Sequence, residues 1–207
     1  MRHAVLLAAS CGLLFGQIDV PKTLHGIEER YNNIKTLKAN FSETATSPSG
    51  RHPTQSGTLY LRKPGKMLWQ YTTPPGKFFL SDKEYTYDYA PNTHRVEKEK
   101  LKEGDDPRGP LAFLLGKVDF DRDFKQFETK DGVITAVPKT ADMPYRLVTF
   151  VVGPDYSIKK LSVTQQDGTV IDYVFDGEVK NPPLADSLFK FALPPGAVVA
   201  DGAGGDR

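Results

Sequence analysis

The chain has 207 residues, of which 27 are Lys or Arg, 26 are Asp or Glu and one is Cys. This length suits one domain with a sizeable core. The formal net charge of +1 lacks the basic excess that binding to a phosphate backbone requires, so the composition argues against a nucleic-acid partner. A single Cys can form neither an internal disulfide nor a zinc site built on several cysteines.

The first sixteen residues have the pattern of a secretory signal peptide. Arg2 and His3 precede an apolar run, Ala4–Phe15, that is shorter than the ~20 residues needed to span a bilayer. We expect cleavage near Gly16, which removes Arg2 and leaves 26 basic side chains against 26 acidic ones. Cys11 keeps a second interpretation open, because the residues before it loosely match a lipoprotein processing site, where the Cys becomes acylated.

One amphipathic helix is predicted at the start of the mature chain. Pro21 falls in its first turn, where proline is tolerated. Apolar residues recur there at steps of three and four, namely Val20, Leu24, Ile27, Tyr31, Ile34 and Leu37.

After this helix the period changes to two, which predicts strands separated by Gly, Pro and Asn turns. The predicted strands cover residues 40–44, 57–62, 67–71, 77–80, 85–89, 94–99, 124–129, 133–137, 145–152, 157–165 and 169–176. A short apolar helix at 111–115, closed by Gly116, interrupts them. We expect one antiparallel sheet whose twist makes it curl, with the two helices packed on its concave side over an apolar chamber.

Candidate catalytic and metal sites are absent from the sequence pattern. His25, His52 and His94 lie in no hydrolase or metalloprotease motif. The segment 119–123 imitates the start of a calcium loop, but Phe124 stands where that loop needs Gly and Lys130 where it needs Glu. We therefore expect no enzyme activity, no cofactor and no metal.

Aromatic residues instead follow three successive predicted strands. The rows comprise Met67, Trp69 and Tyr71, then Phe78 and Phe79, then Tyr85, Tyr87 and Tyr89. They could fill an ordinary core. They could also form an adaptable apolar wall that holds a lipid, since curled sheets often enclose one apolar ligand. The pattern by itself leaves both interpretations open.

Five segments in order resemble the LolA family of periplasmic lipoprotein carriers. Residues 56–71 resemble the family segment G-x-L-x-[VL]-x-[RK]-P-x-x-[FM]-x-W, and the others are 37–42, 79–87, 110–116 and the closing strand at 189–198. The resemblance runs from about Leu24 to Val199. It implies a mainly β fold, an unclosed antiparallel barrel of about eleven strands with a helical lid over a hydrophobic cavity. It also implies one carrier domain at 17–199, followed by a flexible tail at 200–207.

The resemblance further implies a periplasmic monomer that binds the acyl chains of lipoproteins. Its partners would be acylated lipoproteins, an inner-membrane ATP-driven release complex and an outer-membrane lipoprotein acceptor. Two alternatives remain: a lipid-binding periplasmic sensor, and an outer-membrane acceptor lipoprotein of the same fold anchored through Cys11.

The resemblance also assigns roles to individual positions. Lys63 stands where the family has an Arg that helps to hold the lid closed, and a flexible Lys offers a weaker latch than a planar guanidinium. Arg62 faces the other way along the strand and is not expected to replace it. The expected lipid-binding residues are Ile27, Tyr31, Met67, Trp69, Tyr71, Phe79, Tyr85, Tyr87, Leu111, Phe113, Leu114 and Leu115.

Overall fold

The computed structural model describes residues 18–101, 118–141, 143 and 145–201. The predicted signal peptide and the predicted lid helix, with Leu111, Phe113, Leu114 and Leu115, lie outside these residues. Within these residues, two α-helices, α1 (Val20–Asn32) and α2 (Phe120–Asp123), and a 3-10 helix, η2 (Asp186–Phe189), accompany one sheet of 13 strands. The strands are β1 (Thr36–Ser47), β2 (Gly50–Arg51), β3 (Gln55–Arg62), β4 (Lys66–Thr73), β5 (Phe78–Asp82), β6 (Tyr85–Ala90), β7 (Arg95–Lys100), β8 (Phe124–Lys130), β9 (Val133–Pro138), β10 (Tyr145–Val152), β11 (Ile158–Gln165), β12 (Val170–Lys180) and β13 (Val198–Asp201).

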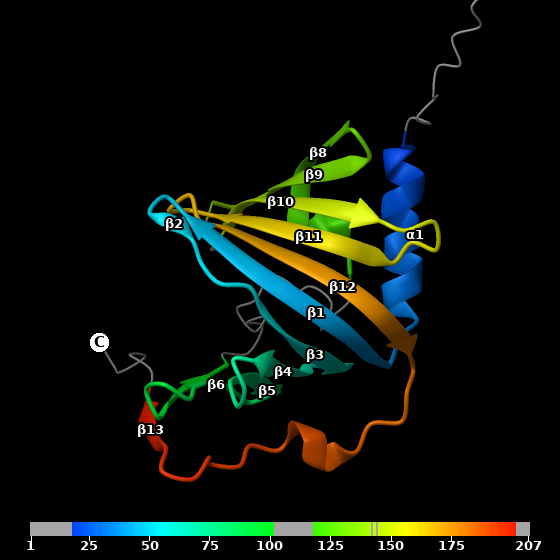
Figure 1. Cartoon of the computed structure of the whole chain (residues 1–207). Helices are drawn as coiled ribbons and strands as arrows, with labels where there is room; N and C mark the ends of the chain where they lie inside the picture. The colour runs from blue at the N-terminus through cyan, green and yellow to red at the C-terminus, as the bar shows by residue number, and fades with distance from the viewer. Residues whose placement is uncertain (1–17, 102–117, 142, 144, 202–207) are drawn as a thin grey trace, which may run out of the picture.

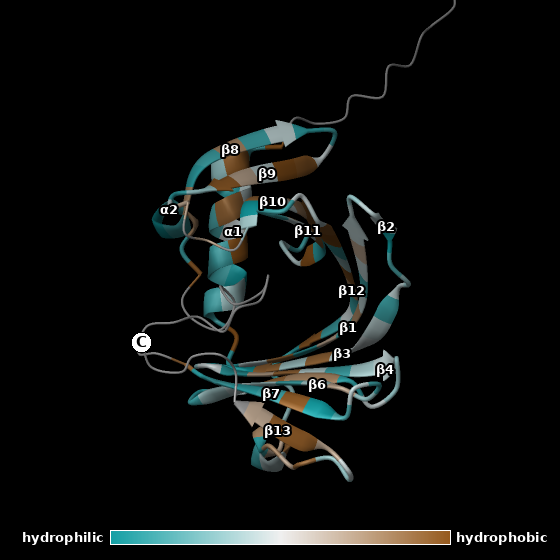
Figure 2. Ribbon diagram, turned by 90° about the vertical axis from the view of Figure 1, so that its left-hand side faces the viewer, coloured by the Kyte–Doolittle hydropathy of each residue, from teal (hydrophilic) through white to brown (hydrophobic). Residues whose placement is uncertain are grey.

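The strand order explains how one sheet can form most of an open barrel. It runs β13-β7-β6-β5-β4-β3-β1-β12-β11-β10-β9-β8, and β2 pairs with β1 beside this path. The β1–β12 pair joins two consecutive meanders. Figure 2 shows the result, a C-shaped sheet with β8–β10 in one arm and β3–β7 in the other. The sheet is therefore unclosed, as predicted, with 13 strands rather than about eleven.

The end of the sheet corrects two expectations. β13 pairs with β7 in parallel, so the sheet is not antiparallel throughout. The closing strand does not begin at Phe189, because Phe189 ends η2. Parallel neighbours need a long crossover instead of a hairpin, and residues 181–197 supply it by passing along the outer side of the β3–β7 arm (Figures 1 and 2). β13 also takes in residues 200 and 201, which were expected in the tail.

Helix α1 ends earlier than its apolar period predicts. Asp19 caps the first turn, accepting a hydrogen bond from the Lys22 backbone N–H at 3.1 Å, and Asn33 is the C-terminal cap. Beyond the cap, the backbone N–H of Lys35 donates to the Asn181 side chain at 2.8 Å instead of continuing the helix. Leu37 is still buried, but from strand β1.

The concave face of the sheet and α1 share one hydrophobic cluster. Helix α1 lies inside the curve, against the β8–β12 side (Figure 2). The helix contributes Leu24, Ile27 and Tyr31. The strands contribute Leu37, Phe41, Leu59, Leu61, Met67, Trp69, Tyr71, Phe124, Ile134, Ala136, Val148, Phe150, Ile158, Leu161, Val163, Tyr173 and Phe175.

A second cluster covers the outer face of the β4–β7 arm. Here the C-terminal crossover packs Leu184, Leu188, Phe189, Phe191 and Ala197 on the strand residues Leu68, Leu80, Tyr87, Tyr89 and Val96. Arg62 fixes the crossover, since its guanidinium binds Asp186 and the Leu184 carbonyl and lies 5.4 Å from the Phe189 ring centroid. Arg62 thus binds the crossover on the outer face and does not take the place of Lys63, which contacts α1.

Gly26 creates a close approach between α1 and the β10–β11 loop. A Cβ at this buried position would lie 2.4–2.6 Å from ring atoms of Tyr156, closer than any real contact. The Tyr156 backbone has a positive φ of 60° and donates its N–H to the Gly153 carbonyl at 2.9 Å, so the residue sits in a tight turn. The missing side chain therefore lets the tyrosine lie directly on the helix.

We predict that Gly26→Ala destabilises the protein, although Gly→Ala inside a helix normally stabilises by about 1 kcal/mol. The clash with Tyr156 outweighs the gain in helix propensity. In a Tyr156→Ala background the same substitution should regain its stabilising sign. Urea unfolding of the four proteins tests this, and a stabilising effect in both backgrounds would contradict the packing described.

We predict that Phe189→Ala costs about 3–5 kcal/mol of unfolding free energy, because its side chain is 1% exposed in the outer cluster. Leu193 is 51% exposed in the same crossover and provides the control. Leu193→Ala should change the unfolding free energy by less than about 0.5 kcal/mol. Equal effects of the two substitutions, measured by urea unfolding, would show that the crossover is not a packed part of the fold.

Candidate functional site

The concave face carries an aromatic surface centred on Trp69. The indole lies 4.7 Å from the Phe41 ring and 5.4 Å from the Tyr173 ring, measured between centroids. Phe175 lies 6.3 Å away and stacks nearly parallel on Tyr173. These rings come from β1, β4 and β12, which the β1–β12 pairing brings together. The arrangement presents a broad apolar surface to whatever packs inside the curve.

Six of the predicted lipid-binding residues belong to this concave cluster. Met67, Trp69 and Tyr71 alternate along β4, as predicted, and the Trp69 N–H donates to the Met67 sulfur at 2.7 Å. Phe79 pairs with Trp69 across β4 and β5 and is partly buried against the cluster. Ile27 and Tyr31 reach it from α1.

Tyr85 and Tyr87 do not belong to this surface, and the expectation of one aromatic wall across three strands is wrong. In the β5–β6 hairpin, Phe79 pairs with Asp88 and Leu80 pairs with Tyr87. Directly paired residues share a face, so Tyr87 lies on the outer face with Leu80. There it stacks on Phe191 of the crossover at 4.2 Å between centroids. Tyr85 packs against the same outer cluster.

Sequence reasoning missed three aromatic residues of the concave face, Phe41, Tyr173 and Phe175. Each lies on an alternating apolar position of a correctly predicted strand. The alternation marks them as face residues, but only the pairing of Phe41 with Phe175 shows that both strands adjoin Trp69. That pairing spans more than a hundred residues of sequence, so no local pattern indicates it.

Polar groups occupy one end of the concave face. Glu43 pairs with Tyr173 on one side and with Gln55 on the other, and it accepts a hydrogen bond from the Tyr71 hydroxyl at 2.8 Å. Burial and then the Glu43 charge raise the pKa of both tyrosines well above the usual range. Both phenols therefore remain protonated hydrogen-bond donors. We call Glu43, Tyr71 and Tyr173 the polar corner.

A second polar network fixes α1 over the sheet. The Tyr31 hydroxyl donates to Glu178 at 2.9 Å and accepts from the Ile158 backbone N–H at 3.0 Å. Arg30 also binds Glu178, and its guanidinium donates to the Asp155 backbone carbonyl at 3.0 Å. Burial and the Glu178 charge raise the pKa of Tyr31 beyond its usual range. The C-terminal half of α1 is thereby bound to β12 and to the β10–β11 loop.

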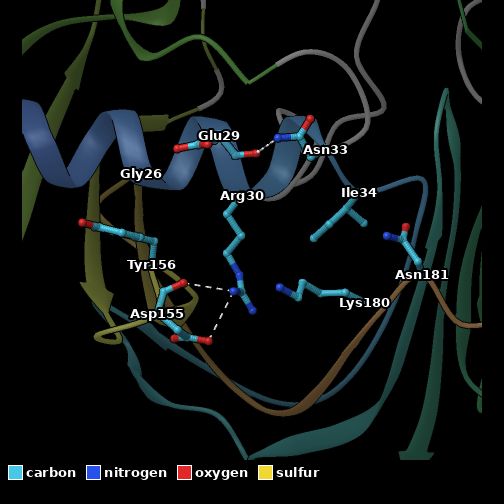
Figure 3. Close-up of a pocket in the computed structure, with 9 residues that line it drawn as sticks. All are labelled: Gly26, Glu29, Arg30, Asn33, Ile34, Asp155, Tyr156, Lys180 and Asn181. Atoms are coloured by element: carbon cyan, nitrogen blue, oxygen red, sulfur yellow. Dashed lines mark hydrogen bonds and ion pairs between the residues drawn. The ribbon is translucent and has the colours of Figure 1, made fainter.

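A polar pocket of about 360 Å³ opens beside this network. Figure 3 shows Arg30 crossing it toward Asp155, with Tyr156 and Lys180 on either side. Acidic and basic groups alternate around the pocket, and its main cation is already paired with Glu178 and Asp155. The pocket belongs to the attachment of α1, away from the aromatic surface of β4.

Lys63 occupies the turn between β3 and β4, beneath the end of α1. Its ammonium group donates to the Tyr31 carbonyl at 2.9 Å, and its backbone N–H donates to the Lys35 carbonyl at 2.9 Å. An ammonium at a helix C-terminus compensates the partial negative charge of the last carbonyls. Burial lowers the pKa of Lys63 from 10.5 to about 8. Lys63 thus links the β3–β4 turn to the helix that covers the concave face.

Two features are missing from the described part of the chain. Within it, no helix combines the length and apolar character needed to cross a membrane. The same residues hold no group of three or more His, Cys, Asp or Glu side chains arranged to bind a metal ion.

Comparisons with known proteins agree with this geometry. The outer-membrane lipoprotein carrier protein of Cupriavidus necator is 27% identical to this chain, covering 96% of it and 99% of the relative. The protein of that name from Dechloromonas aromatica is 28% identical, covering 94% and 95%. A solved structure of an uncharacterized conserved protein from Thermus thermophilus shares the fold, with a TM-score of 0.51 and 10% identity over 89% of this chain and 99% of that one.

A family model, described as outer membrane lipoprotein carrier protein LolA, matches residues 32–192. The match takes in strands β1 to β12, and with them the aromatic surface, the polar corner and Lys63. Since it covers well over half of the sequence, the chain belongs to the LolA family of outer-membrane lipoprotein carrier proteins.

Proposed function

We propose that this protein is a non-catalytic periplasmic carrier that binds the acyl chains of lipoproteins on the concave face and delivers them to the outer membrane. The observation that carries the proposal is the aromatic surface around Trp69, which lies inside an unclosed sheet and is bordered by α1. Membership of the LolA family favours this carrier function over a lipid-binding sensor or an anchored acceptor.

The proposed partners follow from a carrier's cycle. Lipoproteins would be received from an ATP-driven release complex of the inner membrane and passed to an acceptor at the outer membrane. Residues 1–16 would direct the chain into the periplasm and be removed there. The mature chain then has 26 basic and 26 acidic side chains, a balance that avoids strong electrostatic attraction to either membrane.

The energy of acyl binding has to be offset for release to occur. Each CH₂ group transferred from water contributes about 0.8 kcal/mol, so several fully buried chains would bind too tightly to leave. In this structure, side chains from α1 and the sheet already bury much of the concave face against one another. Acyl chains must separate some of these contacts, and that cost reduces the net affinity to a reversible range.

We predict that a triacylated cysteinyl peptide alters the fluorescence of Trp69, the single tryptophan of the chain, while the unacylated peptide does not. Phe79→Ser should weaken this binding by about tenfold or more, because an apolar contact worth ~1.5–3 kcal/mol is lost. Phe78→Ser is the matched control, since Phe78 is similarly buried but packs on the outer cluster. Equal affinities of the two variants would contradict binding on the concave face.

Lys63 is proposed to contribute to holding the cover over this face through its bond to α1. In the unfolded chain its amine titrates near 10.5, and in the folded chain its pKa is about 8. Between these values the unfolded state binds more protons, so the contribution of Lys63 to the unfolding free energy increases as pH rises.

We therefore predict that the stability of the wild type relative to Lys63→Met increases between pH 7.5 and pH 10. Urea unfolding across this range measures the change, and Lys125→Met, at an exposed position of β8, is the control. NMR of the lysine side chains should show one amine titrating near pH 8 that is missing from Lys63→Met. Titration of every lysine near its ordinary value would contradict the buried position of this ammonium.

A further inference from the structure

Tyr173 supplies an unused hydrogen-bond donor at the polar corner. Its side chain is only 5% exposed, and it stacks on Phe175 beside Trp69. Its hydroxyl forms no hydrogen bond with any residue that the structure describes, whereas the neighbouring Tyr71 hydroxyl is bound to Glu43. A buried phenol normally finds a partner. No fully enclosed side-chain oxygen among the described residues lacks one, so this hydroxyl keeps some solvent access.

Among the described residues, the charges around this donor are mainly negative. Glu43 pairs directly with Tyr173 and engages one carboxylate oxygen with Tyr71. Asp88 lies on the same face, paired with Phe79, and its pKa is raised by desolvation and by the charges of Glu97 and Glu43. The carboxyl groups of Glu43, Asp88 and Glu97 therefore lie near the polar corner, at the end of the apolar surface.

Within the residues that the structure describes, Lys77 is the cation that acts on Asp88, and it is already engaged. The Lys77 ammonium donates to the Gln55 side chain at 2.7 Å and lies 4.2 Å from the Tyr71 ring centroid. It lowers the pKa of Asp88, but that pKa remains above its usual value. Among the described residues, the carboxyl groups of Glu43, Asp88 and Glu97 outnumber this cation, so an anionic group brought to the polar corner would meet net repulsion in a partly desolvated site.

Resting on the proposed function, we infer that the polar corner binds the uncharged amide or ester junction from which acyl chains branch, and rejects acyl chains that carry an anionic headgroup. A junction carbonyl accepts the hydrogen bond of the Tyr173 hydroxyl. An amide N–H donates to the Glu43 carboxylate. The chains themselves extend along Trp69 and Phe175. The protein thereby discriminates N-acylated, glyceride-linked polypeptides from fatty acids and anionic phospholipids of equal chain length.

The test uses two probes that share one acyl chain, N-hexadecanoyl-glycinamide, which is neutral, and N-hexadecanoyl-glycine, which is anionic. Trp69 fluorescence reports binding of either, because the indole adjoins both the apolar surface and Tyr173. The wild type should bind the neutral probe at least about tenfold more tightly. Glu43→Gln should reduce this preference to within about threefold, mainly by improving binding of the anionic probe.

Tyr173→Phe should weaken binding of the neutral probe severalfold, since it removes the donor to the acyl amide carbonyl that both probes carry. Glu128→Gln on β8 and Tyr60→Phe are the matched controls and should leave the preference intact. Circular dichroism checks that each variant is folded. Asp88→Asn removes a second negative charge at an exposed position and should also improve binding of the anionic probe.

The outcomes separate this inference from the proposed function. Equal binding of both probes by the wild type, or a preference that survives Glu43→Gln and Asp88→Asn, would overturn the headgroup inference alone. A protein whose fluorescence responds to neither probe and to no triacylated peptide would overturn the carrier function itself.

Discussion

The attachment of α1 to β12 through Glu178 is the interaction on which the concave face depends. One carboxylate accepts bonds from Arg30 and Tyr31, while the Tyr31 hydroxyl also holds the backbone of β11. The helix is short and could not keep its position by helix propensity alone. Because its polar edge is fixed in this way, its apolar side stays packed in the cluster that contains the aromatic surface.

Much of this fold could be predicted from alternation and turn residues, because each strand is a local pattern. Met67, Trp69 and Tyr71 are two residues apart, and that spacing alone places them on one face. Tyr85 and Tyr87 show that alternation within one strand does not predict which face the next strand's residues occupy. The register of the β5–β6 hairpin pairs odd with even residue numbers, so the aromatic row changes face between two strands. Chain alternation cannot reveal this without the loop geometry.

The other missed features depend on contacts between distant segments. Glu43, Tyr71 and Tyr173 come from three strands, and the β1–β12 pairing that unites two of them is not a local property. The early end of α1 reflects the hydrogen bond from the Lys35 backbone N–H to the side chain of Asn181, a residue far along the chain. The parallel position of β13 likewise follows from the crossover on the outer face, which apolar periodicity does not encode.

The position of the crossover at the end of the sequence affects how the protein is made. Its last strand, β13, lies against β7, and the outer cluster on β4–β7 has no other cover among the described residues. Likewise, the concave face cannot form until β12 is available to pair with β1. A chain that emerges N-terminus first therefore exposes two apolar surfaces until β12 and β13 have emerged. Pairing between such distant strands is slow, so these apolar surfaces favour aggregation until both strands are in place.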